Sequence, residues 1–247
     1  AGGFVRARSA PHNLAAGGQG ARRTAEKKWP ATAATVRAVA GVQLRYKTGL
    51  TGEDYVSRQA WREARLERCP LHPRGGCGFA RHGSYARLRP PGARVARWYC
   101  PTAHCTFSLL PDCLAARLPG TLAEVEAVVA VVEASPSLEA AADRLRPDIE
   151  LPGAMRWTRR RVQRVHAALT ALRGVMANDF IACPATVAGF RTCMGVVPVL
   201  PALRARAWLH LAEVSAPLGF RPRLLGGGER RKPNQHHTGP DPPPACG

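Results

Sequence analysis

The chain has 247 residues, of which 36 are Lys or Arg and 17 are Asp or Glu, so its formal net charge at pH 7 is +19. Thirty-two of the basic residues are Arg, which suits a polyanionic partner because a guanidinium group donates two parallel hydrogen bonds to a phosphate. No run approaches the roughly 18 apolar residues of a membrane-spanning helix, so no membrane insertion is expected. Composition favours nucleic acid as the partner, with the ribosome or an anionic membrane surface as alternatives.

The eight cysteines are not evenly spaced, and no apolar signal segment precedes them. A reducing cytosol is therefore expected, where clustered cysteines bind metal more often than they pair with each other. Residues 1–25 are rich in Arg and poor in acids, which is also typical of an organelle transit peptide. The composition favours a bacterial cytoplasmic protein associated with the nucleoid.

Charge is distributed unevenly along the chain. Residues 1–120 carry a net charge of +14, residues 121–150 one of −5, and residues 151–247 one of +10. Such steps indicate separate modules. We expect a partly disordered basic arm (1–48), a helix with a small β unit (49–118), a helical domain (119–178), a C-terminal helical segment (179–225) and a disordered basic tail (226–247). The expected fold is mainly α with a small β ribbon and flexible basic termini.

The first expected elements are two helices. Residues 31–46 can hold one, and the segment 51–69 is expected to be helical from about Tyr55. Four apolar residues lie near one face of that second helix, namely Val56, Ala60, Ala64 and Leu66.

A β-hairpin is expected next. The segment RHGSYARLR (81–89) reads as one strand, PPG (90–92) as a tight turn and ARVARWYC (93–100) as the returning strand. Several side chains of this hairpin are expected to form an exposed basic patch with an aromatic plane beside it, namely Arg81, Arg87, Arg94, Arg97 and Trp98. Contacts of this kind hold phosphates without reading sequence.

Cysteine pairs flank this hairpin, as a zinc ribbon requires. A tetrahedral Zn²⁺ with Zn–S distances of about 2.3 Å would close both turns and substitute for a core that is too small to hold alone. The favoured ligands are Cys69, Cys77, Cys100 and Cys105, while the spacing also permits His72 and His104 as substitutes. The remaining cysteines show no ligand spacing and are expected as core residues or free thiols, namely Cys113, Cys183, Cys193 and Cys246.

The motifs RHGSY (81–85), WYC (98–100) and TFSLLP (106–111) are similar to the zinc ribbons at the front of insertion-sequence transposases and related proteins of unassigned function. The likeness covers residues 69–113 and implies a zinc ribbon in front of a DNA-binding region. Those ribbons usually carry two C-x2-C pairs, whereas this chain has C-x7-C and C-x4-C. The departure leaves the ligand set open between cysteine and histidine.

Three helices are expected after residue 120. Thr121 and Glu124 form a capping box that starts the first, and Ser137 can cap the second, LEAAADRL. Thr158 can cap a long third helix, whose apolar residues are Val162, Val165, Leu169, Leu172 and Met176. The core of this domain is expected to use Val125, Val129, Val162, Val165 and Leu169.

This order of helices suggests a helix-turn-helix domain, although the connection from Leu145 to Thr158 is long for that motif. The start of the third helix is basic, where a recognition helix contacts bases and phosphates. Its expected DNA contacts are Arg159, Arg160, Arg161, Gln163 and Arg164. The alternative is a solvated amphipathic helix, and the apolar stripe can also serve as a dimer seam. Residues 198–215 read as a further helix with Leu203, Ala207, Leu211 and Val214 inward.

No enzyme is expected. Only Asp179, Glu213, Glu229 and Asp241 follow the third helix, so a transposase-type site with well-separated metal-binding carboxylates is not predicted. Phosphate-loop and H-E-x-x-H motifs do not occur. The expected function is binding of duplex DNA through a zinc ribbon and an Arg-rich helix. The alternatives are an RNA- or ribosome-associated zinc-ribbon protein, and a docking subunit of a transposition or transcription complex, with a homodimer as a further option.

Overall fold

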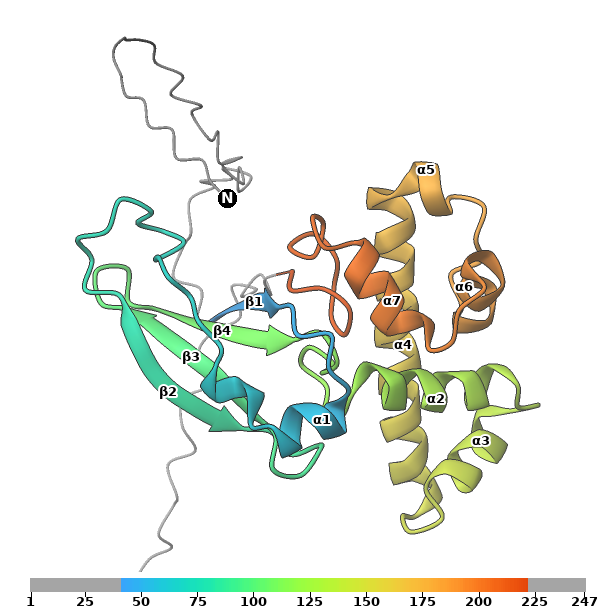
Figure 1. Ribbon diagram of the computed structural model, residues 1–247. Coiled ribbons are helices and arrows are strands. Elements are labelled where there is room, and N and C mark those ends of the chain that lie inside the picture. Colours follow the sequence, from blue (N-terminus) through green and yellow to red (C-terminus); the bar gives the residue numbers. More distant parts are fainter. Residues whose placement is uncertain (1–40, 222–247) are drawn as a thin grey trace, which may run out of the picture. The chain divides into compact units, whose positions relative to one another are not determined.

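The computed structural model describes residues 41–221 (Figure 1). In this part of the chain four strands form one sheet, with two short helices between its first and second strands and six helices after its last strand. The elements are β1 (Val42–Tyr46), α1 (Gly52–Ser57), the 3₁₀ helix η1 (Ala60–Arg62), β2 (Ala80–Ala86), β3 (Arg94–Cys100), β4 (Cys105–Pro111), α2 (Leu122–Glu133), α3 (Leu138–Leu145), α4 (Leu151–Val175), α5 (Ala177–Phe180), α6 (Val187–Met194) and α7 (Val199–Arg206).

The sheet has the strand order β1-β4-β3-β2. Strand β3 runs antiparallel to both β2 and β4, whereas β1 runs parallel to β4. The β2–β3 hairpin confirms the predicted one. The helix predicted over residues 31–46 is wrong for residues 42–46, which form β1, and its earlier part lies outside the described residues. Val42, Leu44 and Tyr46 pack against the core at the two-residue period of a strand.

The second expected helix is much shorter than the sequence suggested. Helix α1 ends at Ser57, and the chain continues through η1 and an irregular segment to Cys69. Tyr55 is buried, and its hydroxyl donates to the carbonyl oxygen of Arg94 at 2.8 Å. This bond holds α1 against the first residue of β3.

The caps of α2 and α3 confirm the sequence-based predictions. The Thr121 hydroxyl accepts from the Glu124 amide at 3.0 Å, and the Glu124 carboxylate accepts from the Thr121 amide at 2.7 Å. The Ser137 hydroxyl accepts from the Ala140 amide at 3.1 Å and begins α3. Satisfying these amides stabilises each helix start, because they have no partner within the helix.

Helix α4 begins at Leu151, so the prediction that Thr158 caps it is wrong. Pro152 lies in the first turn, where its missing N–H costs no helical hydrogen bond. Thr158 is instead buried inside the helix, and its hydroxyl donates to the carbonyl oxygen of Ala154 at 2.8 Å. As a consequence only residues 146–150 separate α3 from α4.

Four of the five predicted core residues of the helical part are buried: Val125, Val129, Val165 and Leu169. Val162 is half-buried and packs against them. Helix α7 ends at Arg206 rather than at residue 215, and turns follow it. Its predicted inward residues are nevertheless all buried, namely Leu203, Ala207, Leu211 and Val214.

Two glutamates of α2 connect it to later elements. The fully buried Glu126 carboxylate pairs with Arg191 at 2.7 Å and accepts from the Leu200 amide at 2.8 Å. The Glu133 carboxylate accepts from the amides of Val187 and Ala188 at the start of α6. Part of the negative charge of residues 121–150 therefore serves helix packing.

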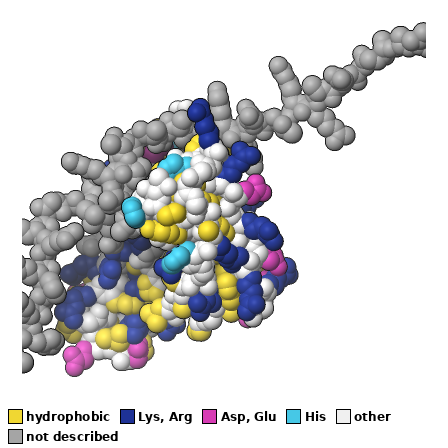
Figure 2. All heavy atoms as spheres, turned by 90° about the vertical axis from the view of Figure 1, so that its left-hand side faces the viewer, with side chains coloured by type: hydrophobic (Ala, Val, Ile, Leu, Met, Phe, Trp, Pro, Cys, Tyr) yellow, Lys and Arg dark blue, Asp and Glu magenta, His cyan; other side chains and the backbone are white. Residues whose placement is uncertain are grey.

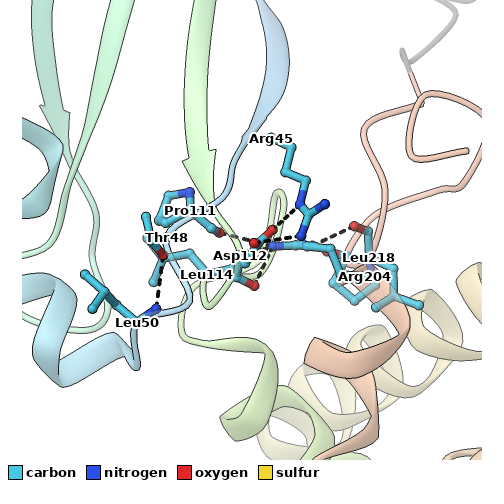
Figure 3. A network of polar contacts seen from close by, with 9 residues as sticks. Arg45, Thr48, Leu50, Pro111, Asp112, Leu114, Arg204 and Leu218 are labelled. Carbon is cyan, nitrogen blue, oxygen red and sulfur yellow. Dashed lines mark hydrogen bonds and ion pairs between the residues drawn. The ribbon is translucent and has the colours of Figure 1, made fainter. Parts of the chain in front are cut away.

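Arg204 is the main polar connection between α7 and the end of the sheet (Figure 3). Its side chain is completely buried, and burial lowers its pKa to about 9. The guanidinium group donates to the main-chain carbonyl oxygens of five residues: Pro111, Asp112, Leu114, Pro217 and Leu218. The Asp112 carboxylate faces Arg45 instead, with nitrogen–oxygen distances of 2.6 and 2.9 Å.

The cysteines outside the hairpin region differ from expectation in one respect. Cys183 and Cys193 form a disulfide that joins the turn after α5 to α6, so they are not free thiols. Cys113 is buried, as predicted, and burial raises its pKa to about 11. Cys246 lies outside the described residues, as do the proposed N-terminal arm up to residue 40 and the tail from residue 226. Among the described helices, none is both long enough and apolar enough to cross a lipid bilayer.

Candidate metal centre

Four side chains meet where the loop before β2 approaches the end of β3: Cys69, His72, Cys77 and Cys100. Their ligand atoms all lie within 4.8 Å of one another. The Nδ1 atom of His72 lies 3.5 Å from the sulfur of Cys69 and 3.4 Å from that of Cys100. In a tetrahedron with metal–sulfur distances of about 2.3 Å and a metal–nitrogen distance of about 2.0 Å, sulfur and nitrogen are about 3.5 Å apart. The group can therefore hold one tetrahedral metal ion.

Two similar turns place the ligands. Each begins with Cys-Pro, at Cys69-Pro70 and at Cys100-Pro101. In the first turn the amides of Leu71 and His72 donate to the Cys69 sulfur, and in the second the amides of Thr102 and Ala103 donate to the Cys100 sulfur. Amide donors stabilise a thiolate, which is the form of cysteine that binds metal.

The pKa values of the Cys69 and Cys100 thiols are shifted in opposite directions. Burial raises the pKa of the Cys69 thiol to about 11, although the two amides oppose this effect. Burial acts in the same direction on Cys100, but the Ala103 amide and the neighbouring thiols outweigh it, so that the pKa of Cys100 is lowered. Of these two sulfurs, that of Cys100 is better prepared to be a thiolate.

Glycines bring Cys77 back toward the other three ligands. Gly75 and Gly76 have φ angles of +84° and +79°, which side chains other than that of glycine rarely allow. The Thr102 hydroxyl then donates to the carbonyl oxygen of Cys77 at 3.4 Å and connects the two loops. The run GGC in the sequence is therefore part of the site.

Three of the four favoured ligands come together, and His72 joins them where Cys105 was favoured. Cys105 lies outside this group. It is the cross-strand neighbour of Cys100 in the β3–β4 ladder, and its thiol accepts from the Val42 amide. His104 is exposed, and its Nδ1 lies 3.2 Å from the Tyr99 hydroxyl. The physical reason is that C-x4-C spans a strand connection here, whereas Cys69-x2-His72 lies within one turn. The two-residue spacing between Cys69 and His72 was the feature of the sequence that could have identified His72 as a ligand.

The basic patch predicted on the hairpin is divided in the structure. Trp98 is only 5% exposed, so the prediction of an exposed aromatic plane is wrong. Arg87 is half-buried and donates to the carbonyl oxygens of Ala115 and Leu118. Arg97 is half-buried beside the ring of Tyr85. Only Arg81 and Arg94 of this set are exposed.

The arginines of α4 also divide into two groups. Arg161 is buried, and its guanidinium group stacks on the ring of Trp157 at 3.6 Å. Arg164 is half-buried and donates to the carbonyl oxygen of Arg117 at 3.0 Å. Arg159, Arg160 and Gln163 are exposed, as is Arg156, which the sequence analysis did not select. Arg156 was missed because α4 was expected to start at Thr158, two residues after it.

Around the candidate metal site the chain is strongly basic. No Asp or Glu occurs between Glu67 and Asp112, whereas Arg residues recur throughout that stretch. Figure 2, which faces the side on which β2 lies in Figure 1, shows Lys and Arg side chains spread over this face, and acidic side chains toward its margins. Such a face attracts polyanions.

Comparisons of this chain with protein-family models, with curated proteins and with solved structures find no match.

Proposed function

We propose that this protein binds duplex DNA through a helix-turn-helix unit of α3 and α4, and that Cys69, His72, Cys77 and Cys100 hold one structural Zn²⁺. The observation that carries the proposal is the short α3–α4 connection, residues 146–150, beside an exposed and basic helix face. Helix-turn-helix domains join a supporting helix to a recognition helix by a short turn, and the N-terminal part of the recognition helix contacts the bases. The resemblance of residues 69–113 to transposase zinc ribbons agrees with this function.

The packing of the helices supports the proposal. Helix α2 contacts both α3 and α4, so the three helices can present α4 as a rigid element. The connection that seemed long from the sequence is short, because α4 starts at Leu151. Its first turns therefore become the part expected to reach the DNA groove.

The exposed side chains of α4 suit a polyanion. Arg156, Arg159, Arg160 and Gln163 are all exposed, and their spacing places them within one face of the helix. No Asp or Glu occurs from Leu151 to Val175, so this helix carries no acidic partner of its own for these arginines. A helix that merely needs to be soluble would usually mix both signs of charge.

The proposed metal is structural rather than catalytic. Four protein ligands complete a tetrahedral site, whereas catalytic zinc keeps one position open for water or substrate. When bound, Zn²⁺ would supply folding energy to the loops between η1 and β4, where the irregular segment 63–79 has few main-chain hydrogen bonds of its own. The sulfur and nitrogen donor set fits zinc.

The test is a binding titration of Arg156→Ala and Arg160→Ala on a duplex selected from a random library, at two salt concentrations. Loss of a base-reading Arg is expected to cost about 1–3 kcal/mol and to relax the preference at one position. Arg206→Ala removes the same charge from an exposed position at the end of α7 and is the control. Equal losses of affinity in all three variants, or no loss in any of them, would contradict the α4 assignment. Equal affinity of the parent protein for any RNA would instead favour the RNA-binding alternative.

A further inference from the structure

A shallow depression lies between η1 and β2, on the same stretch of chain as the metal cluster. Its lining residues are Trp61, Arg62, Arg81, Gly83, Ser84 and Arg94. It thus combines three guanidinium groups with a hydroxyl group and no carboxylate. This lining suits an oxyanion, because guanidinium groups donate paired hydrogen bonds to phosphate oxygens.

Two of these arginines are held in place by neutral acceptors. Arg81 donates to the carbonyl oxygens of Trp61 and Arg62 at 2.7 and 2.8 Å. Arg94 donates to the hydroxyl and the carbonyl oxygen of Ser84 at 2.9 and 3.2 Å. Their positive charges are therefore oriented without being neutralised. Binding of a ligand here therefore costs less side-chain entropy than binding at a site whose arginines must first be ordered.

The strand itself opens the depression. β2 is an edge strand of the sheet, paired only with β3 among the described strands. Its register with β3 shifts between Arg81 and Ser84, where Gly83 has a φ angle of +74°. A bulge of this kind bends an edge strand and redirects its side chains. A side chain at Gly83 would meet no atom within 4 Å, so the backbone is open to a close approach there.

We propose that this depression, formed by Arg62, Arg81, Arg94 and Ser84, binds a phosphodiester group of the nucleic-acid backbone. The proposal rests on the DNA-binding function proposed above and adds a second contact surface to it. Between Glu67 and Asp112 the chain has no acidic residue, which favours a polyanion over a single small anion, because the positive field extends beyond the depression. A backbone contact would set the position of the protein without reading bases.

The experiment compares the full-length chain with Arg62→Ala and Arg94→Ala in fluorescence-anisotropy titrations over a salt series. The probes are a labelled duplex and a labelled single strand of deoxythymidines. Each variant is expected to bind all sequences more weakly and to lower the salt slope by about 0.9 on duplex or about 0.7 on single strand. Arg62→Lys should keep part of the affinity, and Arg206→Ala is the charge-matched control.

The outcomes separate this site from the α4 proposal. Weaker binding by α4 variants with unchanged slopes in Arg62→Ala and Arg94→Ala would overturn the site and leave the DNA-binding function intact. The reverse pattern would overturn the α4 assignment and support the site. Absence of binding to both probes would overturn both. Competition by a polyglutamate peptide as strong as that by unlabelled DNA would overturn the phosphate assignment, and strong competition by inorganic phosphate would identify a small-anion site instead.

Discussion

Replacement of Arg204 by methionine is expected to lower the free energy of unfolding by about 3–5 kcal/mol. The substitution removes the donor to five main-chain carbonyl oxygens in the core, at the end of β4 and near residue 217, and methionine can replace the packing but none of the hydrogen bonds. Each buried carbonyl group left without a donor costs free energy. Urea denaturation followed by circular dichroism measures the change.

The matched control is Arg206→Met, two residues further along α7. Arg206 is exposed and pairs with Asp179 at 3.3 Å, so its loss is expected to cost less than about 1 kcal/mol. Arg204→Lys should remain destabilised, because one ammonium group cannot reach the carbonyl oxygens at the end of β4 and those near residue 217 at the same time. A change below about 1 kcal/mol in Arg204→Met would contradict the role given to this residue.

The second large effect is expected at the metal cluster. Cys100→Ser should reduce zinc affinity by more than about 100-fold, because changes to residues that merely support a ligand already cost about 10–100-fold. Loss of the metal should also lower the melting temperature, because binding of a structural metal contributes folding free energy. Isothermal titration of the metal-free protein and thermal denaturation measure the two effects.

Cys105→Ser is the control, because Cys105 is the cross-strand neighbour of Cys100 but lies outside the cluster. It should keep the zinc stoichiometry of the parent protein. Retention of zinc by Cys100→Ser together with its loss from Cys105→Ser would reverse the ligand assignment.

Features that depend on neighbouring residues could be predicted from the sequence. The capping box of α2 and the cap of α3 were predicted because donor and acceptor lie three positions apart. The hairpin of β2 and β3 and most of the core residues of α2 and α4 also followed from local periodicity. The start of α4 did not, because Pro152 and Gly153 look like a linker although the first turn tolerates them.

Features that depend on distant pairing could not be predicted. Trp98 was expected on the surface of a two-stranded hairpin, but β3 lies inside a four-stranded sheet, where Trp98 faces Phe107 of β4 across the ladder. The acceptors of Arg204 on β4 and the following loop lie 90 or more positions away, so nothing near it in the sequence marks it. The choice of His72 over Cys105 is different, because the two-residue spacing of Cys69 and His72 within one turn is a local signal that the sequence analysis noted but did not favour.

Zinc K-edge X-ray absorption on the purified full-length chain tests the ligand set most directly. One zinc ion per chain is expected, with three sulfur neighbours at about 2.3 Å and one nitrogen neighbour at about 2.0 Å. That result would match the donor set of Cys69, Cys77, Cys100 and His72 in a closed site. Four sulfur neighbours would place Cys105 in the site instead of His72, and a protein that takes up no zinc would contradict the metal centre altogether.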